Sequence, residues 1–135
     1  MYQILLVMSA LVVVFGSWAA EFRDNHVFNQ NWSAHARFHC AAYGLTNVGI
    51  GIICLVIFTS INFHPPQSPT LVLIGISLLL LVDLTMLGTS VVPGVSAIAD
   101  GEKVMHSWPI SYWMTVVHLG IVLVGMLLYL KEIIQ

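Results

Sequence analysis

Charged residues are scarce in this chain of 135 residues. Only 7% of the residues are charged, whereas 59% are hydrophobic. Soluble domains of average composition carry about 25% charged residues. Together with a mean hydropathy of +0.93, this scarcity excludes an ordinary soluble domain and indicates an integral membrane protein whose main partner is the lipid bilayer.

The low charge also excludes several classes of partner and cofactor. The formal net charge is −2, so the chain has no basic patch for nucleic acid and no polybasic run for anionic lipid. Cysteine is equally rare. Cys40 and Cys54 would lie about 21 Å apart along one helix, too far to form a disulfide with each other. No Cys-x-x-Cys-His motif is present, which excludes a covalently attached haem.

Long apolar runs are what the sequence has in abundance. Four of them are long enough to cross a bilayer as helices: residues 2–20, 34–61, 70–92 and 110–130. Prolines interrupt the sequence between the later runs, at Pro65, Pro66, Pro69, Pro93 and Pro109. The sequence therefore predicts an all-α fold, a single transmembrane domain built as a four-helix bundle. Its two longer connections share one side of the membrane.

Ionisable residues collect toward that side. His26, His35 and His39 lie within or beside the first long connection. His118 is about 12 Å into the fourth run from the same side, and Asp83 has a similar depth in the third. Ionisable groups near hydrocarbon are expensive, so their presence is by default a functional-site hypothesis.

The start of the second run has a regular polar pattern. His35, His39, Tyr43 and Asn47 recur every four residues, so on a helix they form one stripe that descends into the bundle. Imidazoles at this spacing can converge on one metal ion. We therefore expect a transition-metal site, of iron, zinc, manganese or copper, with ligands among His26, His35, His39, Asp83 and His118.

Four further residues are expected to support this site: Arg37, Tyr43, Asn47 and Trp32. Each has a structural alternative. Tyr43 and Asn47 could join helices, while Arg37 and Trp32 could sit at the membrane interface. Asp83 could remain neutral and bond to Thr85 or to a neighbouring helix, and His118 could be an uncharged core histidine.

A local resemblance appears in the same stretch. Residues 25–29 read Asn-His-Val-Phe-Asn, Trp32 follows, and residues 35–39 read His-Ala-Arg-Phe-His. This pattern resembles the signature of a family of small four-helix membrane proteins of unknown function, His-x-x-Asn before Trp-x-x-His-Ala-Lys/Arg-Phe-His. Gln30 and the pair Ser33 and Ala34 stand where that family usually has prolines.

A fainter resemblance is to the sterol-isomerase and sigma-2-receptor superfamily, in which a Trp precedes an Asp-Ser-Arg-Tyr element. Here residues 35–38 read His-Ala-Arg-Phe in that place.

Three hypotheses for function follow. In the first, the metal site performs redox or hydrolytic chemistry on a lipid-soluble substrate. In the second and less favoured one, His39 and His118 are the axial ligands of a non-covalent haem in an electron carrier. In the third, the chain is a non-catalytic subunit or a lipid-binding module that contacts partner membrane proteins.

Three structural expectations accompany these hypotheses. His35 and His39 should point into the bundle, because lipid would otherwise meet two imidazoles in consecutive turns. Residues 93–109 should fold over the site as a cover. Asp83, His39 and His118 should form one connected site.

Overall fold

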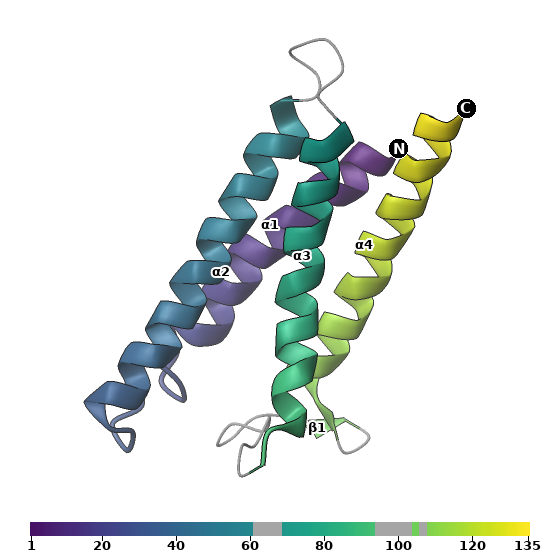
Figure 1. The fold of residues 1–135 in the computed structure, drawn as a ribbon. Helices are drawn as coiled ribbons and strands as arrows, with labels where there is room; N and C mark the ends of the chain where they lie inside the picture. The colour runs from purple at the N-terminus through teal and green to yellow at the C-terminus, as the bar shows by residue number, and fades with distance from the viewer. Residues whose placement is uncertain (61–68, 94–103, 106–107) are drawn as a thin grey trace.

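The computed structural model describes residues 1–60, 69–93, 104–105 and 108–135. These residues form four long helices, α1 (Tyr2–Glu21), α2 (Ala34–Ser60), α3 (Pro69–Gly88) and α4 (Ile110–Ile134) (Figure 1). All four are long and apolar enough to cross a membrane. The chain is an all-α, four-helix, multi-pass integral membrane protein, as the apolar runs predict.

The remaining described elements are short. A 3₁₀ turn, η1 (Thr89–Val91), continues α3, and two short strands, β1 (Val104–Met105) and β2 (Trp108–Pro109), pair antiparallel before α4. The Trp113 indole nitrogen donates to the Met105 carbonyl oxygen at 3.1 Å, which ties this strand pair to the start of α4.

The observed helix ends differ from the apolar runs mainly at α3 and α4. The α3 helix ends at Gly88 and passes into η1, whereas the apolar run continues to residue 92. The α4 helix continues to Ile134, past the last residue of its apolar run, because Lys131 and Glu132 extend the helix with exposed polar side chains. Hydropathy marks the stretch that suits lipid, and a helix can extend beyond it.

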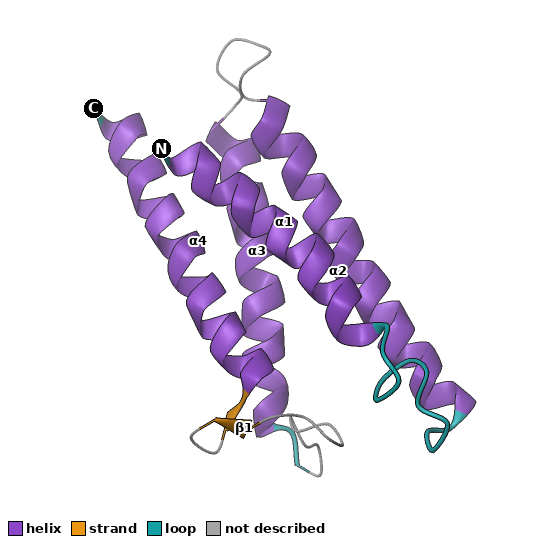
Figure 2. Cartoon of the chain, turned by 180° about the vertical axis from the view of Figure 1, so that it is seen from behind, coloured by secondary structure: helices purple, strands orange, loops and turns teal. Residues whose placement is uncertain are grey.

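The helices pack as a closed ring. α1 contacts α2 and α4, and α3 also contacts α2 and α4. Both chain termini lie at one end of the bundle, and residues 22–33 lie at the other (Figures 1 and 2). This topology follows from four successive crossings. The end that holds the termini is called the terminal half below, and the opposite end the connection half.

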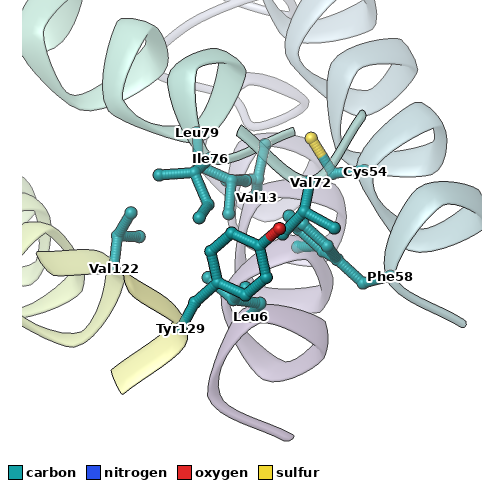
Figure 3. Close-up of a cluster of buried hydrophobic side chains, with 10 residues drawn as sticks. Leu6, Val13, Cys54, Phe58, Val72, Ile76, Leu79, Val122 and Tyr129 are labelled. Atoms are coloured by element: carbon teal, nitrogen blue, oxygen red, sulfur yellow. The ribbon is translucent and has the colours of Figure 1, made fainter. Parts of the chain in front are cut away.

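The terminal half is filled by a continuous apolar core. Phe58 of α2 is fully buried, and a Cβ added to Gly75 of α3 would lie 2.8 Å from its ring. A Cβ at Gly51 of α2 would lie 2.6 Å from the Val14 side chain of α1. Small residues therefore allow close backbone approach. The core consists of Leu6, Ala10, Val13, Cys54, Phe58, Val72, Ile76, Leu79, Val122 and Tyr129 (Figure 3).

In the connection half the helix pair α1 and α2 diverges from the pair α3 and α4 (Figures 1 and 2). The last residue of α1 lies opposite Gly44, in the first half of α2, since a Cβ at Gly44 would lie 2.9 Å from the Glu21 Cβ. The part of α2 before Gly44 therefore projects about 15 Å beyond the end of α1. Ser33 caps this projecting end, because its hydroxyl accepts from the Ala36 backbone N–H at 3.1 Å.

Candidate functional site

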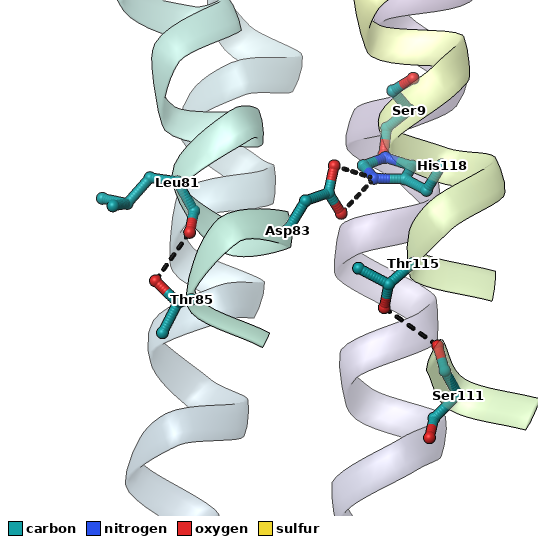
Figure 4. Close-up of polar contacts among 7 residues, drawn as sticks. All are labelled: Ser9, Leu81, Asp83, Thr85, Ser111, Thr115 and His118. Carbon is teal, nitrogen blue, oxygen red and sulfur yellow. Dashed lines mark hydrogen bonds and ion pairs between the residues drawn. The ribbon is translucent and has the colours of Figure 1, made fainter. Parts of the chain in front are cut away.

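The centre of the site is a buried ion pair between α3 and α4. His118 Nδ1 lies 2.8 Å from Asp83 Oδ1 and 3.0 Å from Asp83 Oδ2. The exposed fractions are 3% for Asp83 and 6% for His118. Of the two structural alternatives for Asp83, the bond to a neighbouring helix is formed and the bond to Thr85 is not, because the Thr85 hydroxyl donates to the Leu81 carbonyl oxygen (Figure 4). The similar depths inferred from the sequence correctly place Asp83 beside His118.

The second ring nitrogen of His118 reaches α1. His118 Nε2 lies 3.1 Å from the Ser9 carbonyl oxygen. A carbonyl oxygen can only accept, so Nε2 carries a proton and donates it. Facing lone pairs on Nδ1 and the carboxylate would repel each other, which places a second proton between these two groups. The pair is then either imidazolium with carboxylate or imidazole with carboxylic acid. Its net charge is zero in both forms, which limits the penalty for burial in hydrocarbon.

Beside this pair lies a cavity of about 140 Å³ to which all four helices contribute. Most of its wall is apolar, and the polar contributions come from hydroxyls, one amide, one phenol, two carboxylates and one imidazole. The lining residues are Val12, Val13, Gly16, Ser17, Ala20, Glu21, Tyr43, Asn47, Val82, Asp83, Met86, Ser111, Met114, Thr115 and His118. On α1 they span Val12 to Glu21, so the cavity follows the connection half for about 14 Å.

The two residues of the α2 polar stripe that are farther along the helix line this cavity. Tyr43 and Asn47 both contribute to its wall, and Asn47 is buried. Glu21 reaches the wall from the end of α1, where its carboxylate accepts from the Cys40 thiol at 2.8 Å. Among the described residues, two carboxyl groups and no Lys or Arg line the cavity, so it favours hydrogen-bond donors and cations over anions.

The two residues at the start of the stripe, His35 and His39, lie outside the cavity. His35 and His39 lie on the projecting end of α2, their Nε2 atoms are 3.0 Å apart, and both side chains are exposed. The expectation that they point into the bundle is therefore wrong. The physical reason is that α1 ends opposite Gly44 and leaves this part of α2 without a neighbouring helix.

His26, Trp32 and Arg37 also lie outside the cavity wall. The His26 and Trp32 rings meet edge to face, with centroids 5.9 Å apart. His26 Nδ1 and Arg37 Nε are buried and have no hydrogen-bond partner among the described residues. These three residues belong to the fold of the 22–33 connection and its junction with α2.

Four of the five predicted ligands thus form two separate pairs, Asp83 with His118 and His35 with His39, and the fifth, His26, packs against Trp32. Within the described ranges no group of three or more His, Cys, Asp or Glu side chains is arranged to hold a metal ion. Both ring nitrogens of His118 are already engaged, so a bond from this ring to haem iron would require one of these contacts to open. The proposed covering segment, residues 93–109, lies mostly outside the described residues.

Sequence reasoning missed Ser9 and Glu21. Ser9 contributes a backbone carbonyl, which leaves no signal in the residue type. Glu21 could have been noticed as a carboxylate that ends an apolar run. No protein-family model, no curated protein and no solved structure matches this chain.

Proposed function

We propose that this protein binds a small lipophilic molecule within the membrane, and that the molecule carries a hydrogen-bond donor or a positive charge. The observation that supports this most is the cavity beside Asp83 and His118, in which an apolar wall surrounds a buried carboxylate. Small-molecule sites typically combine a mainly apolar wall with a few placed polar groups.

The cavity size limits the ligand. A volume of about 140 Å³ is close to the roughly 150 Å³ of an engineered apolar cavity in another protein that accepts benzene. One ring or a short branched chain would therefore fill it. A larger lipophilic molecule would place one end in the cavity and extend the rest into the bilayer.

The polar groups of the lining determine which end of the ligand enters the cavity. Asp83 and Glu21 present carboxyl oxygens, which accept hydrogen bonds, and no Lys or Arg is among the described lining residues. A hydroxyl or amino group would be stabilised there, while a carboxylate or phosphate would be repelled. The proton held between Asp83 and His118 also lies at the cavity wall, where it could be exchanged with a bound ligand.

A series of photoreactive probes tests this proposal. The probes share one alkyl diazirine and differ only in ending in a methyl, a hydroxyl or an amino group. The purified full chain in lipid nanodiscs should be labelled more by the hydroxyl and amino probes than by the methyl probe. Peptide mapping should locate the label on the cavity-lining segments of the four helices. Equal labelling by all three probes would contradict the role assigned to the carboxylates.

Two glycine variants provide a matched pair. Gly16 lines the cavity and has no atom closer than 3.9 Å to an added Cβ, so Gly16→Leu should fill the cavity without a clash. Gly120→Leu adds the same side chain at an exposed position on α4 with nothing within 4 Å. Labelling should fall in Gly16→Leu and persist in Gly120→Leu. Unchanged labelling in Gly16→Leu would show that the ligand binds elsewhere.

A further inference from the structure

The exposed pair His35 and His39 lies outside the cavity and is not used by the proposed function. Their Nε2 atoms are 3.0 Å apart, and their rings are nearly perpendicular at 89° with centroids 4.4 Å apart. Both side chains project from consecutive turns of α2, beyond the end of α1. The two nitrogens therefore converge on one point at the surface of the protein.

This separation suits two bonds to one metal ion. With metal–nitrogen distances of about 2.0 to 2.1 Å, nitrogens 3.0 Å apart subtend an angle of about 94° at the metal. Square-planar and octahedral ions need about 90° between neighbouring ligands, whereas a tetrahedral ion needs about 109° and nitrogens about 3.3 Å apart. The pair therefore fits Cu²⁺ or Ni²⁺ with almost no movement, and Zn²⁺ after a slight opening.

We propose that His35 and His39 form a two-nitrogen chelate for a divalent transition metal ion, with Cu²⁺ bound most tightly, at the connection end of α2. Binding replaces the hydrogen bond between the rings, so both rings take the tautomer with the proton on Nδ1 and present Nε2 lone pairs to the metal. The described residues add no third ligand of the His, Cys, Asp or Glu type. Water or an incoming molecule therefore fills the remaining positions.

The direct test is a Cu²⁺ titration of the full chain in lipid nanodiscs, followed by visible absorption and electron paramagnetic resonance. The protein is purified through a tag without histidine, because a polyhistidine tag would bind the same ion. We expect one Cu²⁺ per chain with hyperfine coupling from two nitrogens, and an affinity order of Cu²⁺ over Ni²⁺ and Zn²⁺. Failure of the wild-type chain to bind Cu²⁺ saturably would overturn the proposal.

Substitutions locate the site. His35→Ala or His39→Ala leaves one imidazole and should weaken Cu²⁺ binding by roughly tenfold or more, because the second bond of a chelate forms at high effective concentration. The matched control combines His35→Ala with Ala34→His, which keeps the histidine count but leaves the two rings five residues and about 140° apart around the helix, where they cannot share one ion. This control should bind as weakly as His35→Ala, and wild-type affinity in it would overturn the proposal.

Two further measurements separate this site from other parts of the molecule. His26→Ala should retain the wild-type Cu²⁺ affinity, and an equal loss in that variant would exclude a site made by the pair alone. Probe labelling of the cavity should be unchanged in His39→Ala. Failure of Cu²⁺ binding would thus leave the proposed ligand cavity intact, and failure of probe labelling would leave the metal chelate intact.

Discussion

The two halves of the bundle use the same four helices for different purposes. The terminal half is closed by large apolar side chains such as Phe58 and Leu79, and by glycines that allow helices to touch. The connection half holds a cavity with a mainly apolar wall and a few polar groups. Lipid is as apolar as leucine, so helices associate in a membrane through close packing and hydrogen bonds. Tight packing in one half leaves the other free to diverge and enclose a site.

The Asp83–His118 pair lies where the halves meet. Both residues line the cavity, and Val13 of α1 belongs to the apolar core and to the cavity wall at once. His118 also joins α4 to α1 through the Ser9 carbonyl oxygen. The pair is therefore the polar link that keeps three helices together at the boundary between the halves.

The largest effect is expected at the pair itself. His118→Ala leaves Asp83 buried without its partner and should lower the free energy of unfolding by about 3 to 5 kcal/mol. Detergent-induced unfolding in bicelles measures this change. Replacing Asp83 and His118 together by Leu should cost less than the sum of the single changes, because no unpaired group remains. Additive losses would mean that the two side chains do not act as one unit.

A somewhat smaller loss is expected from the core of the terminal half. Phe58→Ala should lower the free energy of unfolding by about 3 kcal/mol, at the low end of values for soluble cores, because the unfolded side chain still lies in hydrocarbon. Met114→Ala removes an exposed side chain from the cavity wall and should change the free energy by about 0.5 kcal/mol or less. Similar losses in both variants, measured by the same unfolding assay, would remove the contrast between the halves.

A weaker contribution comes from the link between the ends of α1 and α2. Gln3 Nε2 donates to the Phe58 carbonyl oxygen at 2.8 Å. Gln3→Met keeps the shape and removes this bond, so the free energy of unfolding should fall by about 0.6 kcal/mol, the average for hydrogen bonds between membrane helices. Met8→Ala, at an exposed position on the same helix, is the control and should lower it less than Gln3→Met does.

The smallest effect on stability is expected from filling the cavity. Gly16→Leu should leave the free energy of unfolding within about 0.5 kcal/mol of wild type, because the added side chain enters existing space. Leucine also has a higher helix propensity than glycine, which offsets part of any packing cost. A loss of several times that size, compared with Gly120→Leu, would show that the cavity wall is tightly packed.

Sequence reasoning succeeded where depth along a helix was enough. Counting residues from the ends of the apolar runs placed Asp83 and His118 at one level, and the structure pairs them. It failed for His35 and His39, because the count assumed that α2 is surrounded by helices from its first turn. The length by which α2 projects beyond α1 depends on where the two helices touch, at Gly44 and Glu21, and that contact has no local signal.

The hydrogen bond to the Ser9 carbonyl oxygen also lay beyond sequence reasoning. Every helical residue has such a carbonyl group, and the choice of this one follows from how α1 crosses α4. The spacing of Tyr43 and Asn47 predicts that they share one face of α2, whereas the position of that face on the cavity wall follows from how α2 packs in the bundle.

The neutral pair between α3 and α4 also bears on how the protein enters the membrane during synthesis. Asp83 emerges from the ribosome 35 residues before His118, so α3 reaches the translocon with an unpaired carboxyl group that carries a penalty of about 2.5 to 3.5 kcal/mol at a helix centre. The other residues of α3 are the most apolar of the four spans, which offsets this penalty. Insertion of α3 and α4 together as one hairpin would remove the penalty, because His118 would then pair with Asp83. Stable placement of α3 in lipid would thus depend on a residue that is synthesised after α3 has reached the translocon.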